Sequence, residues 1–391
     1  MRALTFCDVA TFYCRTGGGI RTYYDAKLDW FRRQQHHHYV LIVPGARSSV
    51  RALTPWVTVV EARGIELGRG PDGYRIFVDY SRIRAIVRHS KPDVLEAGDP
   101  WVSGPLALYF RRKGAPPRVV SSFFHSDPIP TYVTPLNRRP SVRCLSLPAS
   151  RLASVAFYRL QALYDVTIVT SRCLEARLRQ EGVTDVRRAP FGVDVSLFGD
   201  DNPRPRIDRP RRLLYVGRLD RDKQVDLLLA VLTRVLENPQ VSVTVVGTGA
   251  LRPAFEAWTH PRYRYAGYVR TREALRAIYS EHDVLLAPGA YETFGLAALE
   301  AAAAGLIVVG PDAGGTGDLL NEMSSPFMFS AGDAESFLSA VRAALEADWA
   351  QASQESRALA ARYGTWPDAI ARLVGTYERI VEALPMAGMT A

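Results

Sequence analysis

The stretch RLLYVGRLDRDKQVDLLLAVL, residues 212–232, contains the pattern that decides the fold. A mostly apolar run comes first, a charged turn follows, and the last eight residues are rich in leucine and valine. A continuous apolar run, rather than an alternating one, is typical of a parallel strand that is buried on both faces. The stretch therefore predicts a strand, a turn and a helix, which is the repeating unit of a doubly wound α/β domain.

Similar short apolar or β-branched runs occur along the whole chain, with helical stretches between them. We expect further strands at residues 3–6, 39–43, 57–60, 92–95, 119–123, 166–169, 241–246, 283–286 and 306–309. Three prolines among charged residues at 200–211 suit a linker. The prediction is an α/β protein with two doubly wound, Rossmann-like domains facing a cleft: a first domain at 1–199, a linker at 200–211, a second domain at 212–365, and a terminal helix within 366–391 that packs back on the first domain.

The composition is that of a folded chain. The 391 residues are 47% apolar, which excludes a disordered chain or a fibre. No run approaches the roughly 18 to 20 apolar residues of a transmembrane helix, and Met1 leads into a strand-like run rather than a signal peptide. The cysteines lack C-x-x-C spacing, which favours reduced thiols over disulfides or a zinc ribbon. We therefore expect a cytoplasmic chain.

The charge is distributed unevenly along the sequence. The net charge is +9, but residues 1–199 carry 29 Lys and Arg against 16 Asp and Glu, and residues 200–391 carry 20 against 24. A basic half often faces a polyanion, which can be nucleic acid, an anionic membrane or a phosphorylated substrate. No nucleic-acid-binding motif accompanies the charge, so we expect no nucleic-acid partner.

Two cations flank the turn after the strand at 212–216. Arg218 stands at the carboxyl end of the strand, and Lys223 stands close to the start of the next helix. Ligands of open parallel sheets bind at this edge, and two cations on either side of a turn can neutralise a diphosphate. The alternative is a solvated loop with incidental charges.

The segment APGAYETFGLAALEAAAAG, residues 287–305, predicts a second binding element. A Pro/Gly turn follows the strand, and a helix is expected from about Phe294 to Gly305. The backbone N–H groups of Phe294, Gly295 and Leu296 would then form a phosphate site at the helix N-terminus. Glu292 and Glu300 would lie about 80° apart if both were helical, so that one ligand bearing hydroxyl groups could contact both.

These motifs together resemble those of a known family. Residues 292–300 resemble the E-x7-E motif of glycosyltransferase family 4, whose members are retaining enzymes of the GT-B fold, and residues 217–223 resemble its G-R-x4-K segment. Residues 191–194 are similar to its N-G-V-D turn, and residues 247–249 to its G-x-G loop. The chain departs from the family at Gln224, where a glycine is usual, and at 314–318, where G-G-x-x-E with a proline is commoner.

The resemblance implies a retaining hexosyltransferase that uses a nucleotide-sugar of the GDP-mannose or UDP-glucose type. The second domain would hold the donor and the first would face the acceptor. Glu300 would bind the ribose hydroxyls, Arg218 and Lys223 the diphosphate, the N–H groups of residues 294–296 the distal phosphate, Glu292 the transferred sugar, and the backbone near Val269 the base.

The resemblance assigns a function to two features of the first domain. A glycine triple at 17–19 is by itself more often a mobile turn, but here it resembles the family loop that reaches the donor phosphates, with Gly18 and Gly19 as its contacts. His125 follows the strand at 119–123, and a lone histidine is more often structural. It resembles the family's active-site histidine, which would lie near the anomeric centre.

No cofactor or metal is expected. Asp200 and Asp201 lie in the linker, and no DxD-type acidic metal cluster is apparent, so we predict a metal-independent reaction in which the nucleotide-sugar is a co-substrate. The three histidines at 36–38 cannot all face one ion, which favours a solvated turn.

The acceptor is the least defined part of the prediction. Residues 132–164 interleave five arginines with leucine, valine and aromatic residues, a pattern that can lie in an anionic membrane interface. This favours a lipid or glycan acceptor and an enzyme that is peripheral on the inner face of the membrane. One alternative is an ordinary helix with its leucines directed inward. An alternative function is a catalytically silent nucleotide-sugar-binding protein that docks a partner through its basic first domain.

Overall fold

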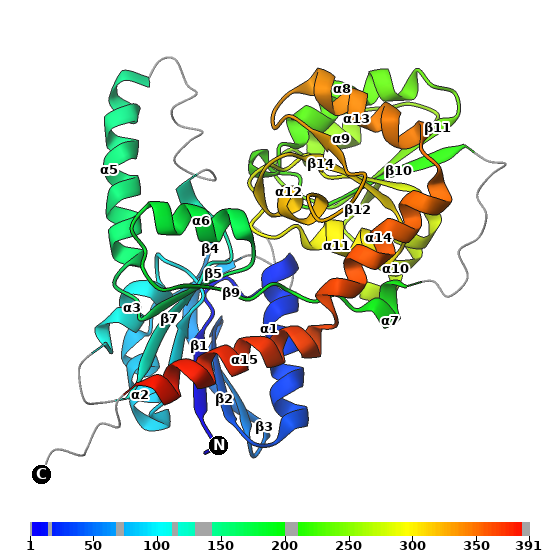
Figure 1. Ribbon diagram of the computed structural model, residues 1–391. Helices are drawn as coiled ribbons and strands as arrows, with labels where there is room; N and C mark the ends of the chain where they lie inside the picture. Colours follow the sequence, from blue (N-terminus) through cyan, green and yellow to red (C-terminus); the bar gives the residue numbers. More distant parts are fainter. Residues whose placement is uncertain are drawn as a thin grey trace, which may run out of the picture.

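A computed structural model describes residues 2–14, 18–67, 74–111, 116–129, 143–199 and 210–384. These residues form two α/β lobes, each with a mainly parallel sheet and helices on its faces (Figure 1). This confirms the expected fold class of two Rossmann-like units. Residues 200–209 of the expected linker lie outside the described part of the chain.

The first lobe is built on a twisted sheet with strand order β3-β4-β2-β1-β6-β7-β8-β9, and β5 pairs with β4. The strands from β4 to β9 along this order are parallel, whereas β3 and β5 pair with β4 in antiparallel fashion. Their bounds are β1 Thr5–Val9, β2 His38–Gly45, β3 Ser49–Thr54, β4 Val57–Leu67, β5 Tyr74–Phe77, β6 Val94–Ala97, β7 Val119–Phe123, β8 Val166–Val169 and β9 Val186–Arg188.

The helices of the first lobe connect these parallel strands. Helix α1 follows β1, α2 and α3 flank β6, and α5 and α6 flank β8, while the short α7 ends the lobe. Their bounds are α1 Gly18–Gln34, α2 Tyr80–Ser90, α3 Ser103–Tyr109, α5 Arg143–Gln161, α6 Arg172–Gln180 and α7 Val195–Phe198. Of the basic stretch at 132–164, residues 132–142 lie outside the described residues.

The second lobe has a wholly parallel sheet with strand order β12-β11-β10-β13-β14-β15. The stretch quoted above forms β10, a 3₁₀ turn η3 and α8, and α8 buries one apolar face that includes Leu228, Val231 and Leu232. The strand bounds are β10 Arg211–Val216, β11 Val241–Val246, β12 Tyr263–Gly267, β13 Val284–Leu286, β14 Ile307–Pro311 and β15 Phe327–Phe329.

The helices of the second lobe complete its two faces. Helix α11 is short and alanine-rich, and its residues from Ala298 to Ala303 are all buried, which explains why small side chains are required there. The bounds are η3 Arg221–Lys223, α8 Val225–Leu236, α9 Arg252–Ala257, α10 Arg272–Glu281, α11 Leu296–Ala303, α12 Gly314–Leu320, α13 Ala334–Glu346, α14 Trp349–Tyr363 and α15 Trp366–Ala383.

The last helix, α15, returns to the first lobe. It begins at a capping box made by Thr365 and Asp368, and the preceding Gly364 has a φ of +71°, which suits glycine. In Figure 1 the red helix lies across the blue helix α1, and the two are in contact. Arg118 donates to the carbonyl of Val381 over 2.9 Å. The fold therefore joins the end of the chain to the first sheet.

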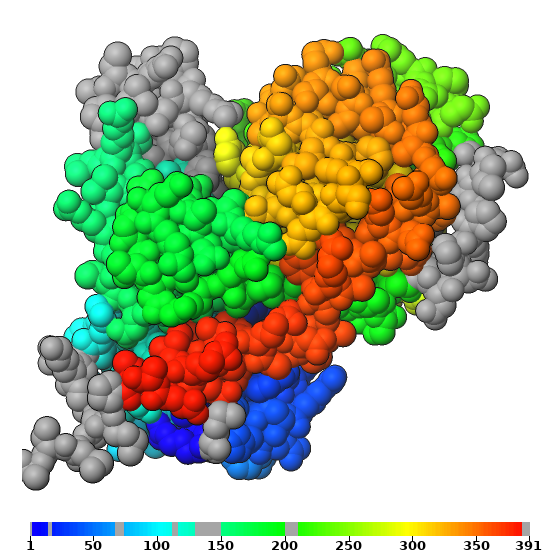
Figure 2. Space-filling view, in the orientation of Figure 1, coloured from blue at the N-terminus to red at the C-terminus, as the bar shows by residue number. Residues whose placement is uncertain are grey.

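The two lobes also touch each other directly. The ring of Phe191 in the first lobe packs against Phe294 and Trp366, with ring centroids 5.2 and 5.1 Å apart. Helix α6 is held by α12, because Asp318 Oδ2 accepts from the backbone N–H of Cys173 over 2.8 Å. Figure 2 shows the green surface of α6 against the yellow and orange surface of the second lobe. The residues of the candidate site lie in this region.

Candidate functional site

The candidate site is built from loops at the carboxyl ends of strands in both sheets. The first lobe contributes the start of α1 after β1 and the loop after β7, and the second lobe contributes the loops after β10 and β13. These are the positions at which parallel α/β sheets bind ligands. The two lobes meet here, since a Cβ on Gly19 would lie 3.6 Å from Leu296 Cδ2. The structure therefore brings the N-termini of α1 and α11 together.

The start of α11 differs in detail from the prediction. The helix begins at Leu296 rather than Phe294, because Gly295 has a φ of +91° and forms the N-cap. A Cβ at Gly295 would lie 2.6 Å from Thr316 Oγ1, so only glycine fits. The first N–H groups of α11 have no intrahelical acceptor and carry the positive end of the helix dipole. The site can thus bind an anion at Gly295 and Leu296, with Phe294 in the preceding loop.

The two glutamates do not share a helix, which corrects the geometric argument drawn from their spacing. Glu292 lies in the loop before α11, and only Glu300 is helical. Glu292 Oε1 accepts from Lys223 Nζ over 2.7 Å. The two carboxylates therefore have different partners and different surroundings.

The predicted cations both have carboxylate partners. Arg218 contacts Asp220 and Asp222, and about half of its side chain is exposed. Burial lowers the pKa of the guanidinium, but Asp222, Asp220 and Tyr74 raise it by more than burial lowers it. The pKa therefore lies above its ordinary value, and the group stays charged. Arg218 and Lys223 can both present positive charge to an anion.

Glu300 lies in a buried environment with two partners from α10. Tyr279 Oη donates to Glu300 Oε2 over 3.3 Å, and Arg272 Nη2 lies 4.0 Å from Glu300 Oε1. Burial raises the pKa of Glu300 to about 7, although Arg272 and Tyr279 lower it. Arg272 and Tyr279 are not among the site residues predicted from the sequence. Their position in the helix after β12 could have indicated them, because that helix follows the loop with Val269.

Val269 lies in the loop between β12 and α10 and is partly buried against the core cluster that also contains α11. Thr271 caps α10 in the same loop by accepting from the backbone N–H of Ala274 over 3.2 Å. The backbone near Val269 thus leads directly into the helix that carries Arg272 and Tyr279. This placement brings the loop to the Glu300 side of α11.

His125 follows the end of β7 by two residues and lies against α1. Its ring stacks on Phe123, with centroids 4.4 Å apart, and also packs against Tyr23 and Tyr24. Its Nε2 atom is buried without a hydrogen-bond partner among the described residues. Burial, and to a lesser degree Lys27, lowers the pKa of His125 to about 3, so the ring is neutral at physiological pH. A buried unpaired nitrogen of this kind can bind a ligand hydroxyl.

Thr293 links His125 to the loop that carries Glu292. Thr293 Oγ1 donates to the carbonyl of His125 over 2.9 Å, and Thr170 Oγ1 donates to the carbonyl of Thr293 over 3.0 Å. Thr293 lies inside the segment at 287–305 but is not among the site residues predicted from the sequence. These bonds position the loop of the second lobe against two strand ends of the first.

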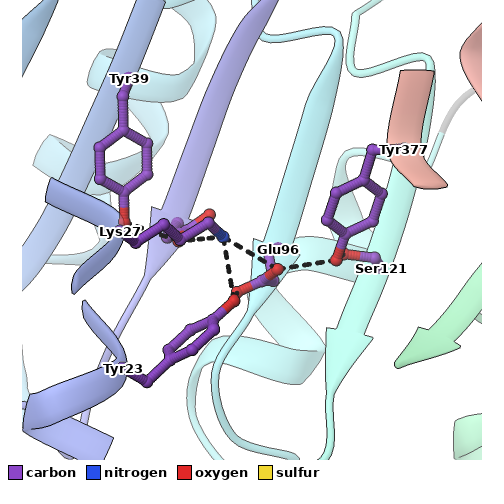
Figure 3. A network of polar contacts seen from close by, with 7 residues as sticks. Tyr23, Lys27, Tyr39, Glu96, Ser121 and Tyr377 are labelled. Atoms are coloured by element: carbon purple, nitrogen blue, oxygen red, sulfur yellow. Dashed lines mark hydrogen bonds and ion pairs between the residues drawn. The ribbon is translucent and has the colours of Figure 1, made fainter. Parts of the chain in front are cut away.

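A buried ionic cluster joins Lys27 of α1 to strands of the first sheet (Figure 3). Lys27 Nζ donates to Asp8 Oδ2 over 2.7 Å and to Glu96 Oε2 over 3.0 Å, and all three side chains are almost fully buried. Tyr23, Tyr39 and Tyr377 donate to the two carboxylates, so that α1, α15 and three strands share one network. This cluster is not predicted from the sequence, because its charged residues lie far apart along the chain.

The three histidines at 36–38 are not all in a solvated turn, which corrects that expectation. His37 is buried, its Nδ1 accepts from the backbone N–H of Leu4 over 3.1 Å, and its Nε2 lies 3.2 Å from Glu378 of α15. His36 and His38 are exposed. Across the described ranges, no group of three or more His, Cys, Asp and Glu side chains could hold a metal ion.

Helix α5 carries an exposed apolar face. The side chains of Leu152 and Val155 are 72% and 46% exposed, whereas Phe157 and Tyr158 attach the helix to the lobe. The alternative in which the leucines point inward is therefore wrong for Leu152. Arg159 follows on the same face at helical spacing and is exposed. No helix within the described residues is long and apolar enough to cross a membrane.

Comparisons with known proteins match both lobes of the chain. Residues 17–197 match the family described as Glycosyltransferase Family 4, and residues 210–347 match Glycosyl transferases group 1. The chain is 28% identical over 309 residues to a GDP-mannose-dependent alpha-(1-6)-phosphatidylinositol dimannoside mannosyltransferase of Mycobacterium tuberculosis, covering 76% of this chain and 77% of that protein. It is 30% identical over 246 residues to a GDP-mannose-dependent alpha-mannosyltransferase of Mycolicibacterium smegmatis, covering 60% and 62%.

Solved structures share the fold over almost the full length. Sucrose-phosphate synthase from Thermosynechococcus elongatus superposes with a TM-score of 0.77 at 21% identity, covering 97% of this chain and all of that one. The Anabaena protein HepE, solved in complex with UDP and glucose, superposes with a TM-score of 0.67 at 14% identity and covers 96% of this chain. At these identities the similarity supports the fold alone.

Proposed function

Because the chain belongs to glycosyltransferase family 4 and has its GT-B fold, we propose that it is a retaining hexosyltransferase that transfers a sugar from a nucleotide-sugar to a lipid or glycan acceptor. The observation that carries the proposal is the convergence of the α1 and α11 N-termini with the turn that holds Arg218 and Lys223. Such a site favours a diphosphate whose negative charge increases as the sugar leaves.

The reaction breaks the bond between the anomeric carbon and the oxygen of the distal phosphate. The electron pair of that bond goes to the nucleoside diphosphate, and the hydroxyl oxygen of the acceptor forms the new bond to the anomeric carbon. The hydroxyl proton passes to the departing phosphate or to solvent, so atoms and charge balance. The protein's task is to stabilise the departing diphosphate and to orient the sugar.

The donor groups are assigned as follows in the proposal. Arg218 and Lys223 exchange their carboxylate partners for the diphosphate, and the N–H groups of Gly295 and Leu296 bind the distal phosphate, with Phe294 before them. Gly18 and Gly19 have no side chains and so allow the start of α1 to approach the phosphates closely, and Gly18 also has a φ of +50°, which favours glycine. Fixed cations and helix termini can stabilise the leaving group, so we propose a reaction without a metal ion or cofactor.

The sugar lies between the two lobes in this proposal. Glu292 accepts hydrogen bonds from its hydroxyl groups, while neutral His125 binds near the anomeric centre through Nε2. The contact between Thr293 and the carbonyl of His125 supports this arrangement, because it brings the Glu292 loop to the end of β7. Glu300 binds the ribose, and the backbone near Val269 contacts the base.

Mannose from GDP-mannose is the donor we propose first. Two relatives are named as GDP-mannose-dependent mannosyltransferases, and one of them is named for a phosphatidylinositol acceptor. The exposed apolar and basic face of α5 supports an acceptor at an anionic membrane surface. We therefore propose a cytoplasmic enzyme that binds peripherally to the inner face of the membrane.

A donor screen tests the proposed function. Purified protein is incubated with GDP-mannose, UDP-glucose and related nucleotide-sugars, with and without detergent-solubilised lipids, and the released nucleoside diphosphate is measured. We expect release of GDP from GDP-mannose that increases with the lipid. If neither GDP nor UDP is released from any donor, the chain is not a transferase and the silent binding protein becomes the better account.

The buried carboxyl of Glu300 predicts a pH-dependent nucleotide affinity. Its carboxylate can accept bonds from both ribose hydroxyls, whereas the protonated acid accepts less well. Since its pKa is about 7 in the folded chain, nucleotide affinity should rise by about threefold to tenfold from pH 6 to pH 8. Calorimetry with GDP and UDP measures this. Glu300→Gln should bind about tenfold more weakly at pH 8 and lack its share of the rise. Equal affinities and equal pH profiles of the two proteins would remove the ribose role.

The face of α5 predicts binding to anionic vesicles. Replacing Leu152 and Val155 together by serine should lower the partition onto phosphatidylglycerol vesicles about tenfold, because both apolar side chains leave the interface. Flotation measures the bound fraction. A matched control replaces Val50, which is 60% exposed on β3, by serine and should bind like the wild type. Equal flotation with neutral and anionic vesicles would contradict the membrane proposal.

A further inference from the structure

Gln224 adopts a backbone conformation that costs energy for any residue except glycine. It ends the η3 turn with a φ of +50° and a ψ of 35°, in the left-handed region. The family commonly has glycine at this position, and this chain has a large polar side chain. A strained residue that persists is usually held by its surroundings, which directs attention to what its side chain does.

The side chain of Gln224 connects two segments of the candidate site. It is 8% exposed, and its Oε1 atom accepts from the backbone N–H of Ala290 over 2.7 Å. Ala290 lies two residues before Glu292, and Gln224 directly follows Lys223. The hydrogen bond thus joins the turn assigned to the diphosphate with the loop assigned to the transferred sugar.

The two segments also share an ion pair, but its two groups are ones that the donor would use. Lys223 Nζ and Glu292 Oε1 form an ion pair of 2.7 Å, and the proposed reaction requires Lys223 to contact the diphosphate and Glu292 to contact the sugar. Gly289 approaches the turn closely, since a Cβ there would lie 3.4 Å from the carbonyl of Lys223. The hydrogen bond from the Ala290 N–H to Gln224 Oε1, here called the tie, uses neither the Lys223 nor the Glu292 side chain. It can therefore stay intact when those two side chains turn to the donor.

We propose that Gln224 is a positioning residue that keeps the Glu292 loop in register with the Lys223 turn while the donor is bound. The proposal rests on the proposed transferase function and adds a residue that supports the geometry of the sugar without touching it. Loss of the tie should therefore lower turnover more than nucleotide binding, because a small displacement of the sugar impairs the reaction while the nucleotide keeps its own contacts.

Two substitutions separate this role from a merely structural one. Gln224→Met keeps the length of the side chain and the strained backbone but removes the acceptor. Gln224→Gly also removes the acceptor but relaxes the backbone at positive φ. The glycine variant should therefore melt at a higher temperature than the methionine variant. If the hydrogen bond matters for turnover, both variants should lose activity to a similar extent.

The expected result is a fall of about tenfold or more in kcat for release of nucleoside diphosphate from GDP-mannose or UDP-glucose, whichever the wild type uses. The dissociation constants for GDP and UDP should stay within about twofold of the wild type. Gln240→Met, at an exposed position of the same lobe, is the control and should behave as the wild type. Wild-type kcat in the glycine variant, or weakened nucleotide binding in step with lost activity, would overturn the proposal.

Hydrogen exchange at the amide of Ala290 gives a readout that does not depend on turnover. Protection of this amide should fall at least tenfold in both Gln224 variants, because its acceptor is lost. Unchanged protection would overturn the positioning role even in an active enzyme. If the wild type turns over no donor while protection still falls, the proposed function fails but the tie between the two segments stands.

Discussion

Replacing Lys223 with alanine is expected to lower kcat/KM for the nucleotide-sugar by about 10²- to 10³-fold. The departing diphosphate gains negative charge as its bond to the sugar breaks, and a fixed cation at this point stabilises that charge more than it stabilises the bound donor. Steady-state measurement of nucleotide release gives the ratio. Most of the loss should appear in kcat, since the helix N-termini and Arg218 still bind the diphosphate.

A neighbouring residue provides the matched control for this prediction. Arg221 lies in the same η3 turn and is exposed, and it has no place in the proposed site. Arg221→Ala removes one positive charge from the same turn and should retain activity within about threefold. If Lys223→Ala and Arg221→Ala lose the same small amount of activity, then general charge rather than a specific contact acts here, and the assignment of Lys223 is wrong.

Replacing Lys27 with methionine is expected to lower the free energy of unfolding by about 3 to 5 kcal/mol at pH 8. The substitution leaves the carboxyl groups of Asp8 and Glu96 buried without their cation, and an uncompensated buried charge is strongly destabilising. The midpoint of urea unfolding, followed by circular dichroism, measures the effect. The triple variant with Asp8→Asn and Glu96→Gln removes the buried charges as well and should recover most of the loss.

The pH dependence of the Lys27 variant has a definite sign. Burial, together with Glu96, raises the pKa of Asp8 to about 7, although Lys27 and its hydrogen bonds lower it. Without Lys27 this folded pKa rises further above the unfolded value, so the folded state binds more protons than the unfolded state. The free energy of unfolding of the Lys27→Met variant should therefore fall as the pH rises from about 4 through 7. A deficit below 1 kcal/mol at pH 8, or one that grows toward pH 5, would contradict the account.

The parts of the fold that the sequence predicted well are those encoded by local pattern. The apolar runs at β10 and β14 lie in parallel strands whose central residues are buried, and β11 buries its valines although Ser242 and Thr244 interrupt the run. Five strands lie outside the predicted ranges, namely β9, β12 and β15 at the sheet ends and the two strands β3 and β5. Strands β3 and β5 pair with β4 in antiparallel fashion, and they are short and partly exposed, so their sequences carry little apolar signal.

The parts that could not be predicted depend on contacts between distant residues. Tyr377 donates to Glu96 across 281 positions of sequence, and no local spacing indicates that these two residues meet. His37 is buried because α15 returns to the first lobe and places Glu378 beside it. Chain topology decides both of these features. The E-x7-E motif differs for a local reason, because the positive φ of Gly295 starts the helix after Glu292 and leaves only Glu300 helical.

A crystal structure of the chain with bound GDP or UDP tests the central claim most directly. We predict that the diphosphate lies between Arg218 and Lys223, within hydrogen-bond distance of the N–H groups at Gly295 and Leu296, and that the ribose contacts Glu300. Nucleotide bound at any other place, with Arg218 still on Asp220 and Asp222 and with Lys223 still on Glu292, would contradict the proposed site.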